Sequence, residues 1–405
     1  MKQNNRRSRM ILFATMFIVM VGFGIIMPIL PYYAENLGAS ATQLGLLTAT
    51  YATLQFLFAP FWGRMSDKIG RKPLIIWGTA GFAVSFIIFG FSTKLWMLFA
   101  ARAFSGLISS ATMPAILAYI SDTTSNEERG EAMAQMGAAM GLGMIFGPVI
   151  GGFLGEVSPT LPFFVAGVIG FGVSILTAFV LPESLSDEIR TQALESKNQP
   201  NSFFSIVKVL GGPLAFLMGI AFLTSFGMSQ LESTGALFYE RRFGAGEAEM
   251  GVIFMVMGIA SAITQGLFVG RAIRTWGEER SLQISLILTG IAYFTYIFIS
   301  NIYTAILAVV LVAITSSLLR PALNSMVSKM TPSTEQGVVM GVVNSYNSLG
   351  RMFGPVVGGM LFDNLGIQGP FISAAIVHVI VGILALFLFS NKIQKTSMPA
   401  CTEAD

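Results

Sequence analysis

Long apolar runs separated by short charged segments constrain the fold of this chain more than any other feature of its sequence. A helix needs about 20 apolar residues to cross a bilayer, because the hydrocarbon core is about 30 Å thick and a helix rises about 1.5 Å per residue. We therefore predict an all-α membrane protein with twelve transmembrane helices. The candidate spans are 10–34, 36–63, 73–93, 95–121, 132–155, 157–182, 209–239, 250–270, 281–299, 302–328, 336–362 and 364–391.

The composition agrees with a bilayer protein and argues against several other classes. Hydrophobic residues make up 54% of the 405 residues and charged residues 11%, whereas a soluble domain carries about 25% charged residues. The net charge of +3 offers no basic surface for nucleic acid. One cysteine, Cys401, and one histidine, His378, are too few for a disulfide framework or a Cys/His zinc site. We expect no enzyme, metal centre or bound cofactor, and the lipid bilayer rather than nucleic acid as a partner.

The distribution of basic residues predicts the orientation of the chain. Lys and Arg gather before the first span and at 63–73, 183–208 and 271–280, which all lie on one side of the membrane. Because cytoplasmic loops carry the excess of Lys and Arg, we predict a multi-pass protein of the bacterial cytoplasmic membrane with both termini in the cytoplasm. The first span is longer than the apolar core of a signal peptide, so we interpret it as a retained helix.

The sequence repeats itself with an offset of 207 residues, which relates Gly70 to Gly277. The strongest match aligns Phe-Gly-Pro-Val-Ile-Gly-Gly at 146–152 with Phe-Gly-Pro-Val-Val-Gly-Gly at 353–359. An even number of spans separates the copies, so both halves keep the same orientation, as in a parallel repeat. We predict an N-terminal six-helix bundle (1–182), a cytoplasmic linker (183–208), a C-terminal six-helix bundle (209–391) and a cytoplasmic tail (392–405).

A glycine-rich basic segment follows the second span. It reads Gly-Arg-Met-Ser-Asp-Lys-Ile-Gly-Arg-Lys over residues 63–72. Gly63 and Gly70 permit a tight turn and a close approach of helices, while Asp67 and Arg71 can form ion pairs that hold one conformational state. An ordinary basic cytoplasmic turn is the alternative interpretation.

Glycines also recur at four-residue spacing in the span 132–155, where they present a smooth face to a neighbouring helix. A proline among them removes a backbone hydrogen bond and favours a bend. Plain helix packing and packing against a partner that changes between conformational states are both open interpretations. The residues concerned are Gly143, Gly147, Pro148, Gly151 and Gly152.

Taken together, these motifs resemble the major facilitator superfamily, and within it the twelve-helix drug/proton antiporters, most closely the NorA/Bmr/Blt-type multidrug exporters. The resemblance extends to Arg102-Ala-Phe-Ser-Gly and to Arg320-Pro. It implies the major facilitator fold and, from the glycine-proline pattern, export by antiport. It also implies that Asp67 and Arg71, with Asp122, stabilise the outward-facing conformation.

Ionisable residues at membrane depth are costly and usually functional. Glu232 is the only acid well inside a span, about 12 Å of helix rise from Glu240, and Arg102 lies at a matching depth, about 12 Å from Lys94. A carboxylate withdrawn from water binds a proton more readily. We interpret Glu232 as the proton carrier and cation-binding group and Arg102 as a coupling residue. The alternatives are a structural ion pair for Glu232 and helix anchoring for Arg102.

The exporters that the chain resembles carry an acid at the end of a Phe-Gly-x-Ser-x-x-Glu motif, which matches residues 226–232. Two positions depart from their pattern, because Ser317 stands in place of an aspartate and Arg351 in place of an uncharged residue. Both changes make the cavity less negative, which favours neutral, zwitterionic or amphiphilic substrates over organic cations. Arg351 either pairs with Glu232 or faces its own bundle. Further candidate cavity residues are Phe226, Met228, Arg320 and Asn344.

From these features we predict a proton-coupled exporter of small amphipathic or lipophilic compounds, such as drugs, that works as a monomer by alternating access. A proton entering from outside would neutralise Glu232 and release the substrate. The alternatives are a lipid or glycolipid flippase of the same fold and a narrow-specificity exporter, for example of the tetracycline type. An inward nutrient symporter and a non-transporting membrane sensor fit the sequence less well.

Overall fold

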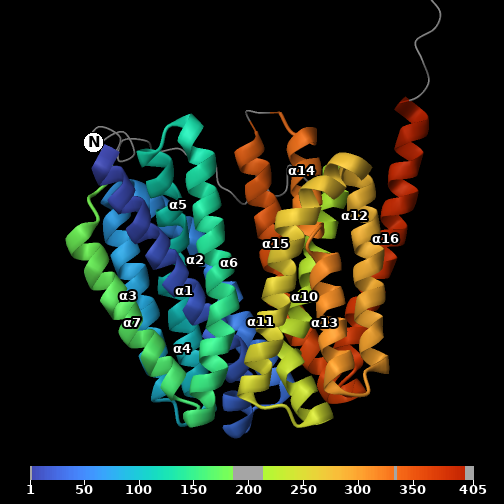
Figure 1. Ribbon diagram of the computed structural model, residues 1–405, viewed down its shortest axis with the longest axis horizontal. Helices are drawn as coiled ribbons and strands as arrows, with labels where there is room; N and C mark the ends of the chain where they lie inside the picture. The colour runs from blue at the N-terminus through green and yellow to red at the C-terminus, as the bar shows by residue number, and fades with distance from the viewer. Residues whose placement is uncertain (1, 186–212, 333–334, 397–405) are drawn as a thin grey trace, which may run out of the picture.

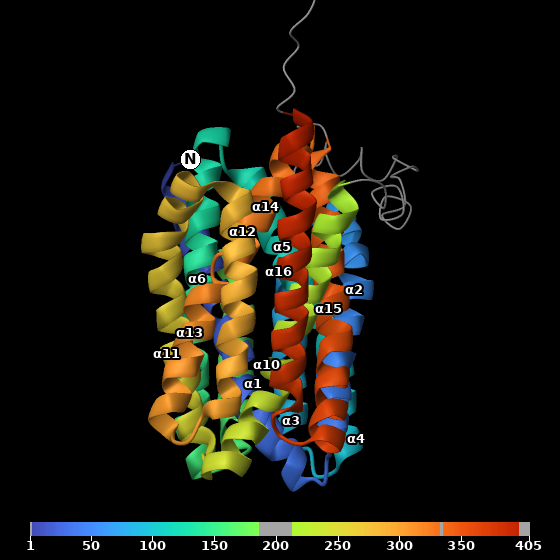
Figure 2. The same cartoon turned by 90° about the vertical axis from the view of Figure 1, so that its right-hand side faces the viewer.

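The computed structural model describes residues 2–185, 213–332 and 335–396. All regular elements of these residues are helices, which stand side by side in an elongated bundle (Figure 1, Figure 2). The first half comprises α1 (Lys2–Asn36), α2 (Ala41–Ile69), α3 (Arg71–Gly90), α4 (Leu95–Ile108), η1 (Ser109–Ala111), α5 (Thr112–Thr123), α6 (Asn126–Val157) and α7 (Leu161–Val180). The second half comprises α10 (Pro213–Phe243), α11 (Glu247–Thr264), η2 (Gln265–Val269), α12 (Gly270–Phe294), η3 (Thr295–Phe298), α13 (Ile302–Ser316), α14 (Leu319–Met330), α15 (Gln336–Leu365) and α16 (Gly369–Thr396).

The helices confirm an all-α membrane protein. Ten stretches of the described residues are long and apolar enough to cross a bilayer. One of them, Glu247–Phe298, holds the successive helices α11 and α12, and α15 falls outside the ten although it is 30 residues long. Polar residues such as Asn347 and Arg351 lower the mean hydropathy of α15. Each predicted span is therefore matched by one helix, or by one broken helix, of the described residues.

Some predicted boundaries are wrong. The turn expected at Gly63 is absent, because α2 continues as a helix to Ile69 and the chain turns only at Gly70. The last helix extends past the predicted end of its span, at 391, to Thr396. Residues 186–208 of the predicted linker and 397–405 of the predicted tail lie outside the described residues.

The internal repeat is visible in the backbone. Gly70 and Gly277 both adopt a positive φ, of 119° and 77°, at equivalent turns. The fourth crossing of each half is interrupted at the same place, so that α5 and α14 both begin just after a break and have equal lengths. Glycine is required at the two turns because other residues are strained at positive φ. The repeat thus preserves the helix breaks as well as the helices.

The first residue of α1 and the last residue of α16 lie at one end of the bundle (Figure 1), which we call the terminal end; the opposite end is the far end. Within the described residues, the hydrogen bonds and ion pairs that join the two halves lie at the far end. Asp363 accepts hydrogen bonds from the backbone N–H and the hydroxyl of Thr42, at 2.9 and 2.6 Å. Arg241 pairs with Glu35 at 2.9 Å, and the Tyr32 hydroxyl donates to a carbonyl before α11.

Candidate functional site

A cavity lies between the two halves and is lined by three charged residues of the sequence-predicted spans. Arg102 reaches it from α4, Glu232 from α10 and Arg351 from α15. These residues are far apart in the chain, so helix packing alone brings them together. The cavity is the candidate substrate and proton site.

Glu232 has an exposed side chain that faces open space rather than protein. It lines both the cavity between the halves and a second cavity within the second half. No described Lys or Arg forms an ion pair with it, and Arg351 shares its cavity without pairing with it. The expectation that helix packing removes this carboxylate from solvent is wrong, since its place in the wall of two cavities leaves it open to small molecules.

Arg102 differs from Glu232, because only 6% of its surface is exposed. Its guanidinium carbon lies 5.3 Å from the centre of the Tyr51 ring and 5.9 Å from that of Phe89. Its Nε has no hydrogen-bond partner, and no described acid pairs with it. Aromatic faces attract a cation but leave the N–H donors of the guanidinium unused. Arg102 is thus an unpaired cation held on aromatic rings at the cavity wall.

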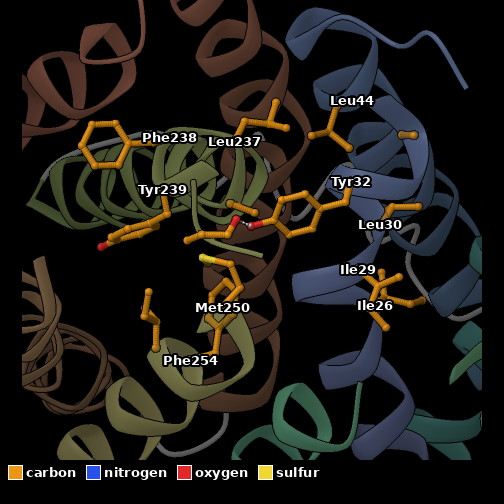
Figure 3. Packing of buried hydrophobic residues seen from close by; sticks show 14 of the residues in the cluster. Ile26, Ile29, Leu30, Tyr32, Leu44, Leu237, Phe238, Tyr239, Met250 and Phe254 are labelled. Carbon is orange, nitrogen blue, oxygen red and sulfur yellow. Dashed lines mark hydrogen bonds between the residues drawn. The ribbon is translucent and has the colours of Figure 1, made fainter. Parts of the chain in front are cut away.

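The second cavity is lined mainly by aromatic and apolar side chains of α10, α11, α12 and α13. Figure 3 shows Tyr239, Met250 and Phe254 gathered around one space. Tyr293 and Tyr296 complete its aromatic wall. Flexible Met and flat aromatic residues can adapt to ligands of different shape. This cavity offers an apolar body a place next to Glu232.

Of the four further candidate cavity residues, one lines one of the two cavities and three do not. Met228 lines the second cavity, whereas Phe226, Arg320 and Asn344 line neither of the two. Phe226 instead stacks on Phe222, and Arg320 lies within electrostatic range of Glu232.

Two further groups belong to the site and were missed. Tyr51 supports Arg102 and accepts a hydrogen bond from Gln55 at 3.1 Å. The tyrosines of the second cavity come from α10, α12 and η3. A lone tyrosine in an apolar helix carries no sequence signal that separates it from packing residues. His378, in contrast, is fully buried and donates a hydrogen bond from Nδ1 to the Ala374 carbonyl, as a packed polar residue does.

The glycine-rich basic segment forms an ion-pair cluster inside the first half. Arg71 pairs with Asp67 at 2.5 Å and with Asp122 at 3.0 Å, and its own side chain is only 8% exposed. Gly70 lies against the Glu183 carboxylate, which accepts the Arg71 backbone N–H. A Cβ at Gly63 would meet nothing within 4 Å, so no close approach requires this glycine.

The second half carries a copy of this cluster with the charges exchanged. Glu278 and Lys329 stand 207 positions after Arg71 and Asp122, and they pair at 2.6 Å. The Lys329 side chain is 67% exposed, so the second pair is far more open to water. The repeat therefore keeps the position of an ion pair and reverses its polarity.

The glycines of the span 132–155 have two kinds of neighbour. Gly143, Gly147 and Gly151 lie against the backbone of α1 in the same half. Gly152 instead lies against Glu247, at the start of α11 in the other half, and Pro148 contacts α11 through its carbonyl. Three of these glycines therefore pack helices within one half, and one packs the two halves together at the far end.

Comparison with known proteins agrees with this geometry. The model of the Major Facilitator Superfamily matches residues 12–293 and 217–400. "Multidrug resistance protein 2" of Bacillus subtilis (strain 168) is 35% identical over 94% of this chain and 95% of its own length. "Tetracycline resistance protein, class B" of Escherichia coli is 31% identical over 85% of this chain and 86% of its own.

A solved structure shares the fold. A bacterial homologue of the human lysosomal transporter Spinster, in an inward-facing and unoccupied conformation, has a TM-score of 0.76 and 15% sequence identity over 99% of this chain and all of that one. The helix arrangement and the sequence similarity both extend along the chain, which belongs to the Major Facilitator Superfamily.

Proposed function

We propose that this chain is a proton-coupled exporter of amphipathic compounds in the bacterial cytoplasmic membrane. The observation that carries the proposal is the place of Glu232, a single open acid in the wall between a charged cavity and an aromatic cavity. The similarity of the chain to a multidrug resistance protein supports export of drug-like compounds. The working unit in this proposal is a monomer.

The distribution of basic residues supports a cytoplasmic terminal end. The far end, where the halves are joined by Asp363, Thr42, Arg241 and Glu35, then faces the outside. In this orientation the structure corresponds to an inward-facing conformation, in which a substrate reaches the cavity from the cytoplasm or the inner leaflet. Rocking of the two halves about the cavity would open the far end and close the terminal end.

In the proposed mechanism, the substrate and the proton compete for Glu232, and this competition couples their transport. An ionised Glu232 holds the basic group of a substrate while its apolar body occupies the second cavity. A proton that arrives from the outside neutralises the carboxylate, weakens its hold on the substrate and favours release. Because the proton and the substrate then occupy one group alternately, their fluxes run in opposite directions.

The Arg71 cluster has a supporting role in this scheme. Its bonds to Asp67 and Asp122 fasten the end of α2 to α5 within the first half. They exist in a structure whose far end is closed, so they do not by themselves require the outward-facing conformation. We propose that they keep the first half rigid while it moves. The stabilisation of the outward-facing conformation that the resemblance implies stays a prediction.

The proposal is tested by transport into everted membrane vesicles, whose cytoplasmic face points outward. Two dyes serve as probes, tetramethylrhodamine and its methyl ester, which share one aromatic body. We expect vesicles energised by respiration to accumulate at least one dye, a protonophore to abolish the accumulation, and Glu232→Gln to abolish it as well.

A matched control is Glu131→Gln, which removes an exposed acid that bonds only Gln135. This variant is expected to transport like the wild type. Accumulation that survives both the protonophore and Glu232→Gln would contradict proton coupling. If neither dye moves while a fluorescent phospholipid does, the chain is a flippase and the proposal fails.

A further inference from the structure

We propose that Arg102 and Arg351 form a carboxylate site in the central cavity, and that the substrates are therefore zwitterionic amphipathic compounds with an acidic and a basic group. This inference rests on the proposed export function and specifies its substrate class. It begins from the charge of the cavity, which has two arginines and one acid in its lining. With Glu232 ionised, the lining keeps an excess positive charge that repels a simple organic cation.

Arg102 is the fixed half of the site. A buried cation is costly unless it is paired or hydrogen-bonded, yet this guanidinium has neither an ion pair with any described residue nor a partner for its Nε. The rings of Tyr51 and Phe89 hold its position. Since the residue lines the cavity, its unused donors are available to a ligand there.

Arg351 is the other half of the site and comes from the opposite bundle. Its side chain is exposed, lines the same cavity and pairs with no acid of the described residues. Two like charges facing one cavity repel each other, and an anion placed between them removes the repulsion. The planar guanidinium also matches the two oxygens of a carboxylate. The two halves thus contribute one arginine each to an anion site.

Other groups of the two cavities indicate where the basic group and the apolar body of the substrate bind. Glu232 lies in the same cavity and also in the wall of the aromatic cavity. A basic group bound at Glu232 would place the adjoining apolar body among Tyr239, Tyr293 and Phe254. A proton on Glu232 would release only the basic group, so the carboxylate site is compatible with exchange of substrate for proton.

Binding to the purified protein in detergent tests the inference without any ion gradient. The probes are tetramethylrhodamine, which carries a free carboxylate beside its cationic ring system, and its methyl ester, which is a cation alone. Fluorescence anisotropy gives the Kd of each. A hydrogen bond to a charged group contributes about 1.5–3 kcal/mol, so we expect the wild type to bind the acid about tenfold or more tightly than the ester.

The variants separate charge at the site from charge elsewhere. Arg351→Gln is expected to weaken binding of the acid about tenfold and to leave binding of the ester unchanged or stronger. Arg351→Lys keeps the charge and is expected to retain part of the preference. Arg274→Gln, which removes an exposed arginine whose Nε bonds only a carbonyl of its own helix, is the control and is expected to bind both dyes like the wild type.

Equal affinity of the wild type for acid and ester would overturn the inference, and so would an equal loss for both dyes in Arg351→Gln. These outcomes differ from a failure of the proposed function. Proton-driven accumulation of the ester alone in vesicles would leave the export function standing and refute the carboxylate site. Selective binding of the acid without proton-dependent transport would do the reverse.

Discussion

Two charged residues of the same cavity are held in opposite ways. Glu232 is open to the cavities, whereas Arg102 is buried on aromatic rings without an acid beside it. A buried ion costs several kcal/mol of desolvation, and a cation–aromatic contact returns about 1–2 kcal/mol. The position of Arg102 therefore costs stability, which is typical of a residue kept for function.

Replacing this arginine separates stability from binding. We expect Arg102→Met, which retains an apolar chain on the Tyr51 ring, to raise the thermal unfolding midpoint of the purified protein and to abolish the preference for the carboxylate dye. Differential scanning fluorimetry and the anisotropy assay measure the two effects on one sample. A lowered midpoint together with unchanged dye binding would show that Arg102 is an anchor for helix packing.

At the scale of helices, the repeat places two ion pairs at equivalent positions in unlike surroundings. Arg71 is nearly buried and pairs with both Asp67 and Asp122, so removal of the Asp122 charge leaves it only partly compensated, which costs up to about 3–5 kcal/mol. Lys329 is exposed, and a surface pair contributes about 0–1 kcal/mol. We expect Asp122→Asn to lower the thermal unfolding midpoint clearly and Glu278→Gln to change it little. Equal losses in both variants would contradict this distinction.

Helix contacts across the halves depend on glycine. A Cβ at Gly359 in α15 would collide with the Ala41 carbonyl of α2, and a Cβ at Gly152 in α6 would lie 2.5 Å from the Glu247 carbonyl of α11. Overpacking of this kind costs about 1–3 kcal/mol, which changes a two-state population by about five- to 150-fold. Because these contacts join the two halves where the far end is closed, the cost falls on the conformation whose far end is closed.

We therefore expect Gly359→Ala to open the far end. Spin labels attached to cysteines at Lys94 and Tyr303, in a Cys401→Ser background, report the separation of the two halves by pulsed electron resonance. The distance distribution should shift to longer values in Gly359→Ala. Gly141→Ala is the matched control, because a Cβ at Gly141 meets nothing within 4 Å. An identical shift in both variants would rule out the proposed collision.

At the scale of the whole molecule, the far-end contacts define which side of the cavity is closed. Asp363 accepts hydrogen bonds from the first residues of α2, so a carboxylate of the second half caps a helix of the first half. Carboxylates are stabilised at helix N-termini by the free N–H groups and the helix dipole. This contact must break each time the far end opens.

A reversible bond at this place tests alternating access directly. We expect Thr42→Cys combined with Asp363→Cys, in the Cys401→Ser background, to form a disulfide under mild oxidation. The Thr42 hydroxyl and the Asp363 carboxylate are hydrogen-bonded at 2.6 Å, which brings the two side chains together. The cross-link should stop dye accumulation in everted vesicles, and a reductant should restore it. Full transport by the cross-linked protein would contradict the rocking mechanism. Each single-cysteine variant is the control for oxidation itself.

The sequence alone determined the class of fold and its division into repeats. Continuous apolar runs of about 20 residues cross a bilayer as helices, because a helix satisfies every backbone N–H and C=O group within the span itself. The positive φ at Gly70 and Gly277 shows that the repeat also encodes the turns. Glu232 and Arg102 could be singled out because ionisable residues at membrane depth are rare.

Only the tertiary structure decided which of these residues meet. The position of a helical residue fixes its depth, but the rotation and tilt of its helix follow from packing against distant segments. For this reason the sequence could not show that Arg351 shares a cavity with Arg102, nor that Phe226 and Asn344 lie outside both cavities. The openness of Glu232 and the unpaired state of Arg102 are likewise products of packing between helices far apart in the chain.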